Sequence, residues 1–295
     1  MNAIKTENPG ASAKAIQHHY DVGNEFYRLW LDSNNVYSGA LWEENDSLDT
    51  AQLRKIDYHI NQSKARGAKR VLDIGCGWGA VLKRLVEENN VESALGLTLS
   101  VAQAEWIKSF NHPKIEVRVE NWLDHFPEVP YDSIISIGAF EHFAKIELSD
   151  VDKVQAYRTF FQRCHEWLKP DGYLSLQTIT YGKTRREVAR KSQATQFISK
   201  DIFPESDPPR LIDVIEAVEG LFEVVALHND REGYERTCRA WLERLRAVRK
   251  EAINIAGDEV VTDFEHYFKV FCVGFATGNL GLLRVTLRRI NNSRS

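Results

Sequence analysis

The sequence predicts an α/β fold built around a doubly wound, mostly parallel β-sheet. Short apolar runs typical of buried strands recur along the chain, and segments with helical spacing separate most of them. The first of these runs ends in a glycine-rich turn that leads directly into a helical pattern. Such an alternation places parallel strands side by side, with helices on both faces of the sheet.

Residues 1–69 are expected to form a polar leader and a helical lid. Aromatic and aliphatic residues recur at helical spacing over residues 14–31, and Gly23 is expected to divide this segment into two helices. A further amphipathic pattern predicts a helix over residues 47–66. We expect these helices to cover part of the remaining chain.

Residues 70–295 are expected to supply the sheet and its helices, within a single compact domain overall. Late helices are predicted over residues 237–252 and 260–277, and a helical insertion over about 181–215. The last strand is expected to close the sheet at an edge. The seven runs predicted as strands are residues 70–74, 93–97, 115–119, 133–137, 172–178, 222–227 and 281–289.

The composition provides ample material for a core and an aromatic pocket. The chain has 295 residues, 43% of them hydrophobic, and its net charge of −4 gives no indication of nucleic-acid binding. Its four cysteines form no C-x-x-C pair, so we predict reduced thiols, no metal site and a cytoplasmic location. No apolar run reaches the ~20 residues of a transmembrane helix. Membrane contact stays open as an alternative but is not favoured, and a homodimer is an alternative for which the sequence contains no specific signal.

The glycine-rich turn is the strongest local signal of a ligand site. It has the spacing G-x-G-x-G through Gly75, Gly77 and Gly79, and Asp73 precedes it. Glycine permits sharp turns and close approach of a ligand, and the helix N-terminus offers backbone donors. The turn lacks the Gly-Lys-Ser/Thr ending of P-loops and the G-x-G-x-x-G spacing preferred by NAD and FAD. It favours S-adenosylmethionine, with a purely structural turn as the alternative.

The end of the second predicted strand departs from the common pattern for a bound nucleoside. An acidic residue for the ribose hydroxyls is usual there, but residues 96–100 contain no carboxylate. We expect Thr98, Ser100 and Gln103 to supply the hydrogen bonds instead.

Several segments together resemble one family of enzymes. They are residues 20–27, 37–38, 72–79, 96–100 with Gln103, 136–143, 202–204 and 234–237. In this order they resemble the cyclopropane fatty acid and mycolic acid cyclopropane synthases, which are S-adenosylmethionine-dependent methyltransferases. The resemblance extends from about residue 15 to the final strand. It implies the Rossmann-like fold of class I methyltransferases, with seven strands of which the last is antiparallel.

The resemblance also implies a set of cofactor contacts. The cofactor would be S-adenosylmethionine and its product S-adenosylhomocysteine. Trp122 is expected to cover the adenine, with simple core packing as the alternative for this side chain. With Asp73 of the turn included, the expected contacts are Tyr37, Ser38, Asp73, Gly75, Gly77, Thr98, Leu99, Gln103 and Trp122.

The chemistry of that family requires a base. The π electrons of an alkene attack the sulfonium methyl group, and a proton is then removed from the resulting carbocation. Aromatic faces stabilise such a cation. A lid over residues 20–37 would keep out the water that quenches it.

The family's cyclopropane-forming members use a bound bicarbonate as base, and this chain keeps only part of its pocket. Gly39 stands where those members have cysteine, and Gln177 where they have histidine. Glu141, Tyr234 and the backbone of Ile137 are retained, so these three and Gln177 form the predicted catalytic set. Bicarbonate is therefore doubtful, and we expect Glu141 to be the base, because burial raises a carboxyl pKa. Weak bicarbonate binding and a structural carboxylate at a helix start are the alternatives.

A basic segment at residues 183–191 and further arginines indicate an anionic acceptor. Arginine binds phosphate well, so we predict that Tyr20, Arg186 and Arg236 bind the substrate. The alternative for the basic segment is a solvated helix face. Residues 196–209 are more polar than the wall of an acyl tunnel, which argues against a long lipid tail.

The sequence is therefore interpreted as a C-methyltransferase acting on a small phosphorylated or isoprenoid diphosphate-type alkene. One alternative is a cyclopropane synthase acting on an unsaturated fatty acyl lipid, and another is an N-methyltransferase of a small amine. A third is a non-catalytic S-adenosylmethionine-binding protein. Retention of Glu141 and Tyr234 argues against the third, because a binding protein has no use for a base.

Overall fold

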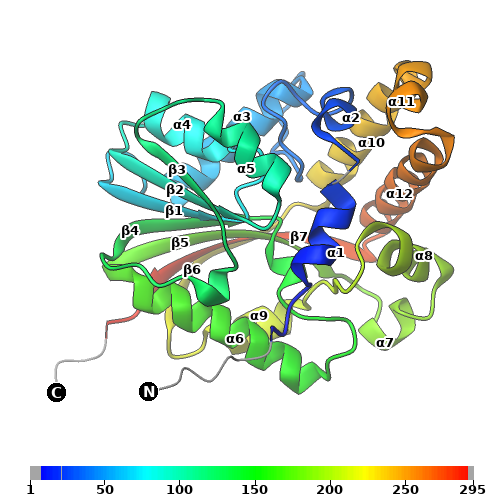
Figure 1. The fold of residues 1–295 in the computed structure, drawn as a ribbon. Helices are drawn as coiled ribbons and strands as arrows, with labels where there is room; N and C mark the ends of the chain where they lie inside the picture. The colour runs from blue at the N-terminus through cyan, green and yellow to red at the C-terminus, as the bar shows by residue number, and fades with distance from the viewer. Residues whose placement is uncertain (1–7, 21, 292–295) are drawn as a thin grey trace.

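A seven-stranded sheet forms the centre of the computed structural model, which describes residues 8–20 and 22–291 (Figure 1). The strand order is β3-β2-β1-β4-β5-β7-β6. Strands β1 to β5 pair in parallel, and β7 is antiparallel to both β5 and β6. The predicted class and the antiparallel last strand are confirmed. The strands are β1 Arg70–Ile74, β2 Ser93–Thr98, β3 Ile115–Val119, β4 Tyr131–Ile137, β5 Leu168–Tyr181, β6 Phe222–Asn229 and β7 Leu280–Arg289.

The prediction that the last strand lies at an edge is wrong, because β7 lies between β5 and β6. Residues 281–287 of β7 are buried without interruption. Burial of every residue in such a stretch, here including Arg284 and Thr286, suits a strand with neighbours on both sides and both faces covered. In β6, only Phe222 is buried. Its exposed side chains make β6 the better edge strand.

Helices cover both faces of the sheet (Figure 1). Helices α3, α4 and α5 lie over one face and α6 and α9 over the other, while α7, α8, α11 and α12 stand beyond one end. The helices are α1 Ala13–Tyr20, α2 Asn24–Arg28, α3 Leu48–Gln62, α4 Ala80–Glu88, α5 Val101–Lys108, η1 Trp122–Asp124, η2 Phe140–His142, α6 Asp150–Trp167, α7 Arg186–Ala189, α8 Gln193–Phe197, η3 Ile198–Ile202, α9 Leu211–Val218, α10 Arg231–Ala247, α11 Arg249–Ala256 and α12 Asp258–Ala276.

Local signals account for several helix boundaries. Gly23 separates α1 from α2 with a φ of 103°, as predicted. Ser47 caps α3, because its side chain accepts a hydrogen bond from the Thr50 amide at 3.1 Å. Helix α3 ends at Gln62, earlier than predicted, and Lys64 just beyond it adopts a left-handed φ of 59°.

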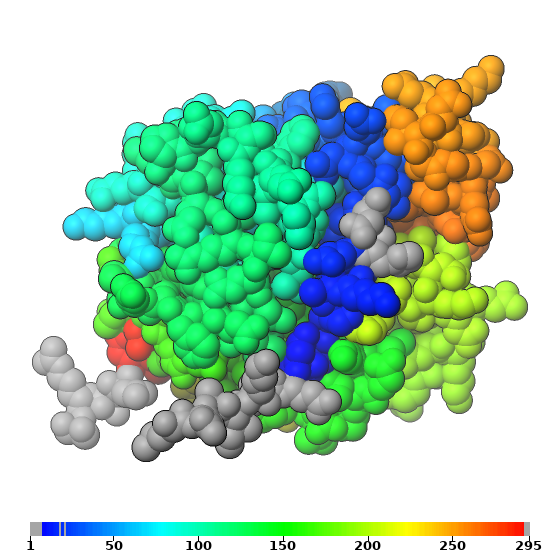
Figure 2. All heavy atoms as spheres, in the orientation of Figure 1, coloured from blue at the N-terminus to red at the C-terminus, as the bar shows by residue number. Residues whose placement is uncertain are grey.

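One hydrophobic cluster joins α2 and the residues that follow it to helices α10 and α12. Trp30 is fully buried, with its ring 5.7 Å from that of Trp241 and 5.0 Å from that of Phe268. Edge-to-face aromatic pairs of this kind add to the stabilisation from burial. Helix α1 lies at the surface between the part of the molecule that carries α5 and the part that carries α8 (Figure 2).

The chain before α1 is tied to the loop after β4. The Ala11 amide donates to the His142 carbonyl at 2.7 Å, and the Lys145 amide donates to the Pro9 carbonyl at 2.8 Å. The first seven residues of the predicted leader lie outside the described residues. None of the described helices combines the length and apolar character needed to cross a membrane.

Candidate active site

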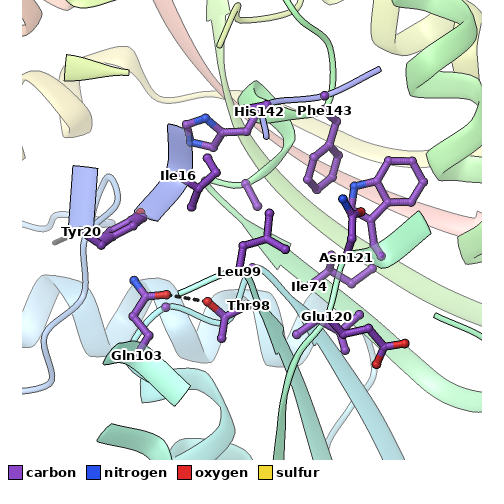
Figure 3. Close-up of a pocket in the computed structure, with 18 of the residues that line it drawn as sticks. Ile16, Tyr20, Ile74, Thr98, Leu99, Gln103, Glu120, Asn121, His142 and Phe143 are labelled. Carbon is purple, nitrogen blue, oxygen red and sulfur yellow. Dashed lines mark hydrogen bonds between the residues drawn. The ribbon is translucent and has the colours of Figure 1, made fainter. Parts of the chain in front are cut away.

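The first of four neighbouring cavities lies beside the glycine-rich turn, at the carboxyl ends of β1 and β2 (Figure 3). This cavity A encloses about 690 Å³. Helix α1 borders it through Ile16 and Tyr20. Its lining residues are Asn8, Gly10, Ala11, Ile16, Tyr20, Ile74, Gly75, Gly77, Leu97, Thr98, Leu99, Gln103, Glu120, Asn121, Trp122, Gly138, Ala139, His142 and Phe143.

The backbone of the turn requires glycine. Gly75, Gly77 and Gly79 have φ values of 80°, 53° and 83°, in the left-handed region. A Cβ atom at Gly75 would lie 2.4 Å from the Cβ of Ala139. The turn therefore presents bare backbone to the cavity, as its sequence predicts.

Several polar groups of cavity A come from the ends of β2 and β3 and from α5. Thr98 donates to Gln103 Oε1 at 2.7 Å (Figure 3). Trp122 lines the cavity and also packs against Phe143, with ring centroids 5.2 Å apart. Trp122 is therefore both a wall of cavity A and a side chain packed in the core, and its predicted contact with the adenine stays a prediction. Glu120 also lines the cavity, and the sequence analysis missed this carboxylate just beyond the third strand.

Cavity B, of about 510 Å³, lies on the other side of the turn and contains buried charges. Lys55 from α3 donates to Ser38 Oγ at 2.8 Å. Burial lowers the pKa of Lys55 to about 7. Burial also raises the pKa of Asp73 to about 7, and Asp73 Oδ2 has no hydrogen-bond partner among the described residues. The cavity is lined by Tyr20, Asn35, Val36, Tyr37, Ser38, Lys55, Asp73, Gly75, Cys76, Gly77, Trp78, Ala80, Val81, Gln103, Ile137 and Gly138.

Cavity C, of about 600 Å³, places one carboxylate among aromatic rings. Glu141 Oε1 accepts a hydrogen bond from the Ile179 amide at 2.5 Å, while Oε2 has no partner within the described chain. Burial raises the pKa of Glu141 to about 7. The cavity is lined by Tyr20, Tyr37, Gly138, Glu141, His142, Ile179, Ile198, Phe203, Ser206, Pro208, Tyr234, Tyr267 and Phe271.

Cavities A, B and C meet at Tyr20 and Gly138, which line all three. Burial, and then the charge of Glu141, raise the pKa of Tyr20 to about 12. A ligand that fills A and B can therefore present a group to C past these two residues. Tyr267 and Phe271 of α12 complete the aromatic wall, and the sequence analysis did not predict them. Their only sequence signal is aromatic spacing along a late helix.

The structure shows how the two departures from the bicarbonate pocket are accommodated. A Cβ at Gly39 would lie 2.8 Å from Tyr234 Cγ and 2.8 Å from Leu282 Cδ2, so other side chains occupy that space. Gln177 donates to the Gly39 carbonyl at 3.1 Å and accepts from Arg284 Nε at 2.9 Å. Its amide is engaged by the protein and does not line cavity C. The structure therefore gives Gln177 a supporting contact in place of the predicted catalytic one.

The two arginines predicted to bind the substrate, Arg186 and Arg236, lie outside the four cavities. The guanidinium of Arg186 is buried and forms ion pairs with Asp150 and Asp213. Arg236 lies 4.2 Å above the Trp42 ring and donates to a backbone carbonyl at 3.0 Å. Because both cations are already engaged by the protein and line none of the four cavities, the prediction that they hold a phosphate is corrected.

Cavity D continues cavity C as an apolar groove of about 1020 Å³. The two cavities share Ile179, Ile198, Ser206, Pro208 and Phe271. Further apolar walls come from Ile146, Val188, Ala189, Ala194, Val270, Val273 and Leu280.

The prediction that residues 196–209 are too polar to line an acyl tunnel is wrong, because part of this segment lines cavity D. Ile198 faces cavities C and D, whereas Gln196 and Lys200 are exposed. The segment therefore contributes Ile198 and Pro208 to the groove, together with the polar residues Ser199, Ser206 and Asp207.

Comparison with known proteins identifies the family. The model of the mycolic acid cyclopropane synthetase family matches residues 8–285. The chain belongs to this family. It is 36% identical over 291 residues to cyclopropane mycolic acid synthase MmaA2 of Mycobacterium tuberculosis, covering 94% of each chain. It is 34% identical to cyclopropane mycolic acid synthase 2 of Mycobacterium leprae over 86% of each chain.

Solved structures of family members agree with this fold. The structure of MmaA2 from Mycobacterium tuberculosis superposes with a TM-score of 0.85 at 32% identity, over 96% of this chain and 100% of that one. CmaA1 complexed with SAH and CTAB gives 0.85 at 30% identity and the same coverage. A geranyl diphosphate C-methyltransferase from Streptomyces coelicolor, at 12% identity and a TM-score of 0.66 over 96% of this chain and 100% of that one, shares the fold alone.

This member of the cyclopropane synthetase family is an S-adenosylmethionine-dependent methyltransferase-type enzyme. The residues of cavities A and B fit that cofactor. Cavity A combines bare turn backbone with the indole of Trp122, which suits a nucleoside, and cavity B holds the unpartnered Asp73 oxygen. Comparison and geometry therefore agree on the cofactor.

Proposed function

We propose that this enzyme transfers a methyl group from S-adenosylmethionine to the double bond of an unsaturated acyl chain and closes a cyclopropane. One observation carries the proposal: the apolar groove of cavity D leads into cavity C, where Glu141 has an unpartnered oxygen. A mainly apolar groove suits an acyl chain better than a phosphorylated head. The names of the relatives point to the same class of acceptor.

In this proposal the cofactor spans cavities A and B and supplies an electrophilic methyl group. Thr98, Gln103 and Trp122 would hold its adenosyl part, and Ser38 and Asp73 would hold its amino-acid part. Tyr20 and Gly138 line cavities A, B and C, so they would border the route from the bound cofactor to an acceptor in cavity C. Leu99, with Gly75 and Gly77, contributes to the wall of cavity A.

Cavity C would stabilise the cation and remove the proton. The alkene π electrons form a bond to the methyl carbon, leaving a carbocation on the chain and S-adenosylhomocysteine as product. Rings of Tyr20, Phe203 and Tyr234 surround this space and stabilise the cation through their π faces. Glu141 then accepts one proton of the new methyl group, and the released electron pair closes the ring. Burial keeps water away from the cation.

The test is a labelled-methyl transfer assay with the purified enzyme. Vesicles of an unsaturated phospholipid, vesicles of the saturated lipid of equal chain length and short isoprenoid diphosphates are offered separately. The proposal expects label only in the unsaturated lipid, with ring protons in the proton spectrum of the product. Label in the diphosphates alone, or equal label in both lipids, contradicts it.

A further inference from the structure

A short segment that borders both cavity C and cavity D contains a buried carboxylate, Asp207, to which the proposed mechanism gives no role. Asp207 is 1% exposed and lines cavity D. Its neighbours Ser206 and Pro208 line both cavities. An acyl chain that runs from the groove into cavity C passes this segment, so the placement of the segment affects where the double bond comes to lie.

Three donors from separate parts of the chain converge on the Asp207 carboxylate. The Tyr181 hydroxyl, on β5, donates to Oδ1 at 2.7 Å, and the Arg190 guanidinium donates to Oδ2 at 2.7 Å. The buried ammonium of Lys153, on α6, lies 3.1 Å from Oδ2. Hydrogen bonds between ionised groups are short and strong, and a buried ion pair is costly to break. These contacts therefore hold the carboxylate in one place.

The main chain of Asp207 connects this charge cluster to the proposed base. Its amide donates to the carbonyl of Glu141 at 3.2 Å, and its carbonyl accepts from the Tyr157 hydroxyl at 3.3 Å. The adjacent Ser206 Oγ lies 2.5 Å from Nδ1 of His142, which follows Glu141 in the chain. The main chain at Asp207 and the main chain at Glu141 are therefore held together.

Arg190 connects the same carboxylate to the wall of the groove. It directly follows α7, and the α7 residues Val188 and Ala189 line cavity D. The ion pair between Arg190 and Asp207 therefore ties this wall to the segment that contacts Glu141.

We infer that Asp207 is a positioning residue that fixes the groove wall and the proposed base relative to each other. Its contact with Arg190 holds α7 along the acyl chain in cavity D, and its amide holds Glu141 beside the double bond in cavity C. Asp207 itself contacts no reacting atom. The inference rests on the proposed function, because it requires an acyl chain in cavity D.

Steady-state kinetics with two acceptors separate the two effects. Asp207→Asn keeps the size of the side chain and an oxygen for Tyr181, but removes the charge that Arg190 and Lys153 contact. The KM for an unsaturated phospholipid should rise about tenfold, from the loss of one charge-assisted hydrogen bond. The KM for a short-chain alkene that does not reach cavity D should stay within about twofold.

The same variant should lower kcat about tenfold with both acceptors, because the amide that holds Glu141 shifts with its segment and misplaces the base. The dissociation constant of S-adenosylhomocysteine should stay within about twofold, since Asp207 lines neither cavity A nor cavity B. This combination of effects differs from a general loss of folded protein, which would lower kcat alone.

Asp213→Asn is the matched control. Asp213 is an equally buried carboxylate that forms ion pairs with Arg186 and Arg210 of the same cluster, but it lines none of the four cavities. Both variants should unfold at a lower temperature than the unaltered enzyme, and only Asp207→Asn should change kcat and the phospholipid KM. Equal kinetic changes in both variants, or unchanged kinetics in Asp207→Asn, overturn the inference.

A double-mutant cycle tests the connection through Arg190, and Arg190→Met alone decides the matter if Asp207→Asn does not fold. Arg190 is partly exposed, so Arg190→Met is the milder change. It should raise the phospholipid KM about tenfold, and the double variant should show less than the product of the two single effects. An unchanged phospholipid KM in Arg190→Met, or a full product in the double variant, contradicts the inference alone. Failure of the unaltered enzyme to label any unsaturated lipid contradicts the proposed function first, and the inference with it.

Discussion

Cavities A and B present turn backbone and buried charges, whereas cavities C and D are walled mainly by aromatic and aliphatic side chains. The first pair comes mostly from the ends of β1, β2 and β3 with α1 and α3, the second from η2, β5, α12 and the segment after β5. This difference indicates that cavities A and B suit a charged cofactor, whereas cavities C and D suit a long apolar chain and a transient cation. Glu141 is the one carboxylate that lines cavity C among the described residues.

Replacing the Glu141 carboxylate should have the largest effect on turnover, and it should leave the cofactor cavities A and B unchanged. Glu141→Gln removes the proposed base and should lower turnover by about 10²–10⁴-fold. The dissociation constant of S-adenosylhomocysteine should be unchanged, because Glu141 does not line cavity A or B. Labelled-methyl transfer and calorimetry measure the two quantities, with the exposed Glu128→Gln as control. Near-normal turnover in Glu141→Gln would rule out the assignment.

The pH profile tests the same group without a substitution. Burial raises the Glu141 pKa to about 7, so the carboxyl is protonated and inactive below that pH and becomes a base above it. At saturating cofactor and acceptor, kcat should rise roughly thirtyfold from about pH 5.5 to a plateau above pH 8. A profile that is flat across this window means a group of ordinary carboxyl pKa, or no titrating base.

Obstructing the apolar groove should affect the acceptor and spare the cofactor. Ala189 lines cavity D, and Ala189→Trp should raise the KM for a long acyl chain about tenfold, as expected from the loss of roughly two buried methylenes. The affinity for S-adenosylhomocysteine and the KM for a short-chain alkene should not change. Ala247→Trp, at an exposed position of α10, is the matched control. An equal effect on short and long chains would mean that the groove does not hold the chain.

The smallest expected effect is that of added bicarbonate on turnover. Its addition should leave the turnover of the unaltered enzyme unchanged, because Gln177 is engaged by Gly39 and Arg284. Gly39→Cys should destabilise the protein by about 1–3 kcal/mol, because its Cβ meets the Tyr234 ring and Leu282. Thermal unfolding and transfer assays with and without bicarbonate measure both outcomes. A bicarbonate-dependent rise in the unaltered enzyme would restore bicarbonate as the base.

The sequence predicted the cofactor half of the site better than the acceptor half. Gly75, Thr98 and Gln103 lie in short segments at strand ends, so their neighbourhood follows from the alternation of strands and helices. The position of β7 between β5 and β6 was not predicted, because the pattern of a single strand does not indicate which strands lie beside it. Lys55 was missed because it occupies an ordinary position in a helix pattern.

The acceptor half depends on contacts between distant parts of the chain. Arg186 was predicted to bind the substrate, and only the fold brings Asp150 and Asp213 to it. Tyr267 and Phe271 line the same cavity as Glu141, because α12 packs against residues far earlier in the chain. Local patterns contain no information on such pairings, and this is why the prediction of a phosphate site failed. The assignment of Glu141 as base stays a prediction.

The most direct measurement uses S-adenosylmethionine with a fully deuterated methyl group and an unsaturated lipid. If Glu141 removes a proton from the transferred methyl group, one deuteron is lost and the product carries a dideuterated ring carbon. Mass and deuterium spectra of the isolated lipid distinguish the cases. A product that retains an intact trideuteromethyl group would contradict ring closure beside Glu141.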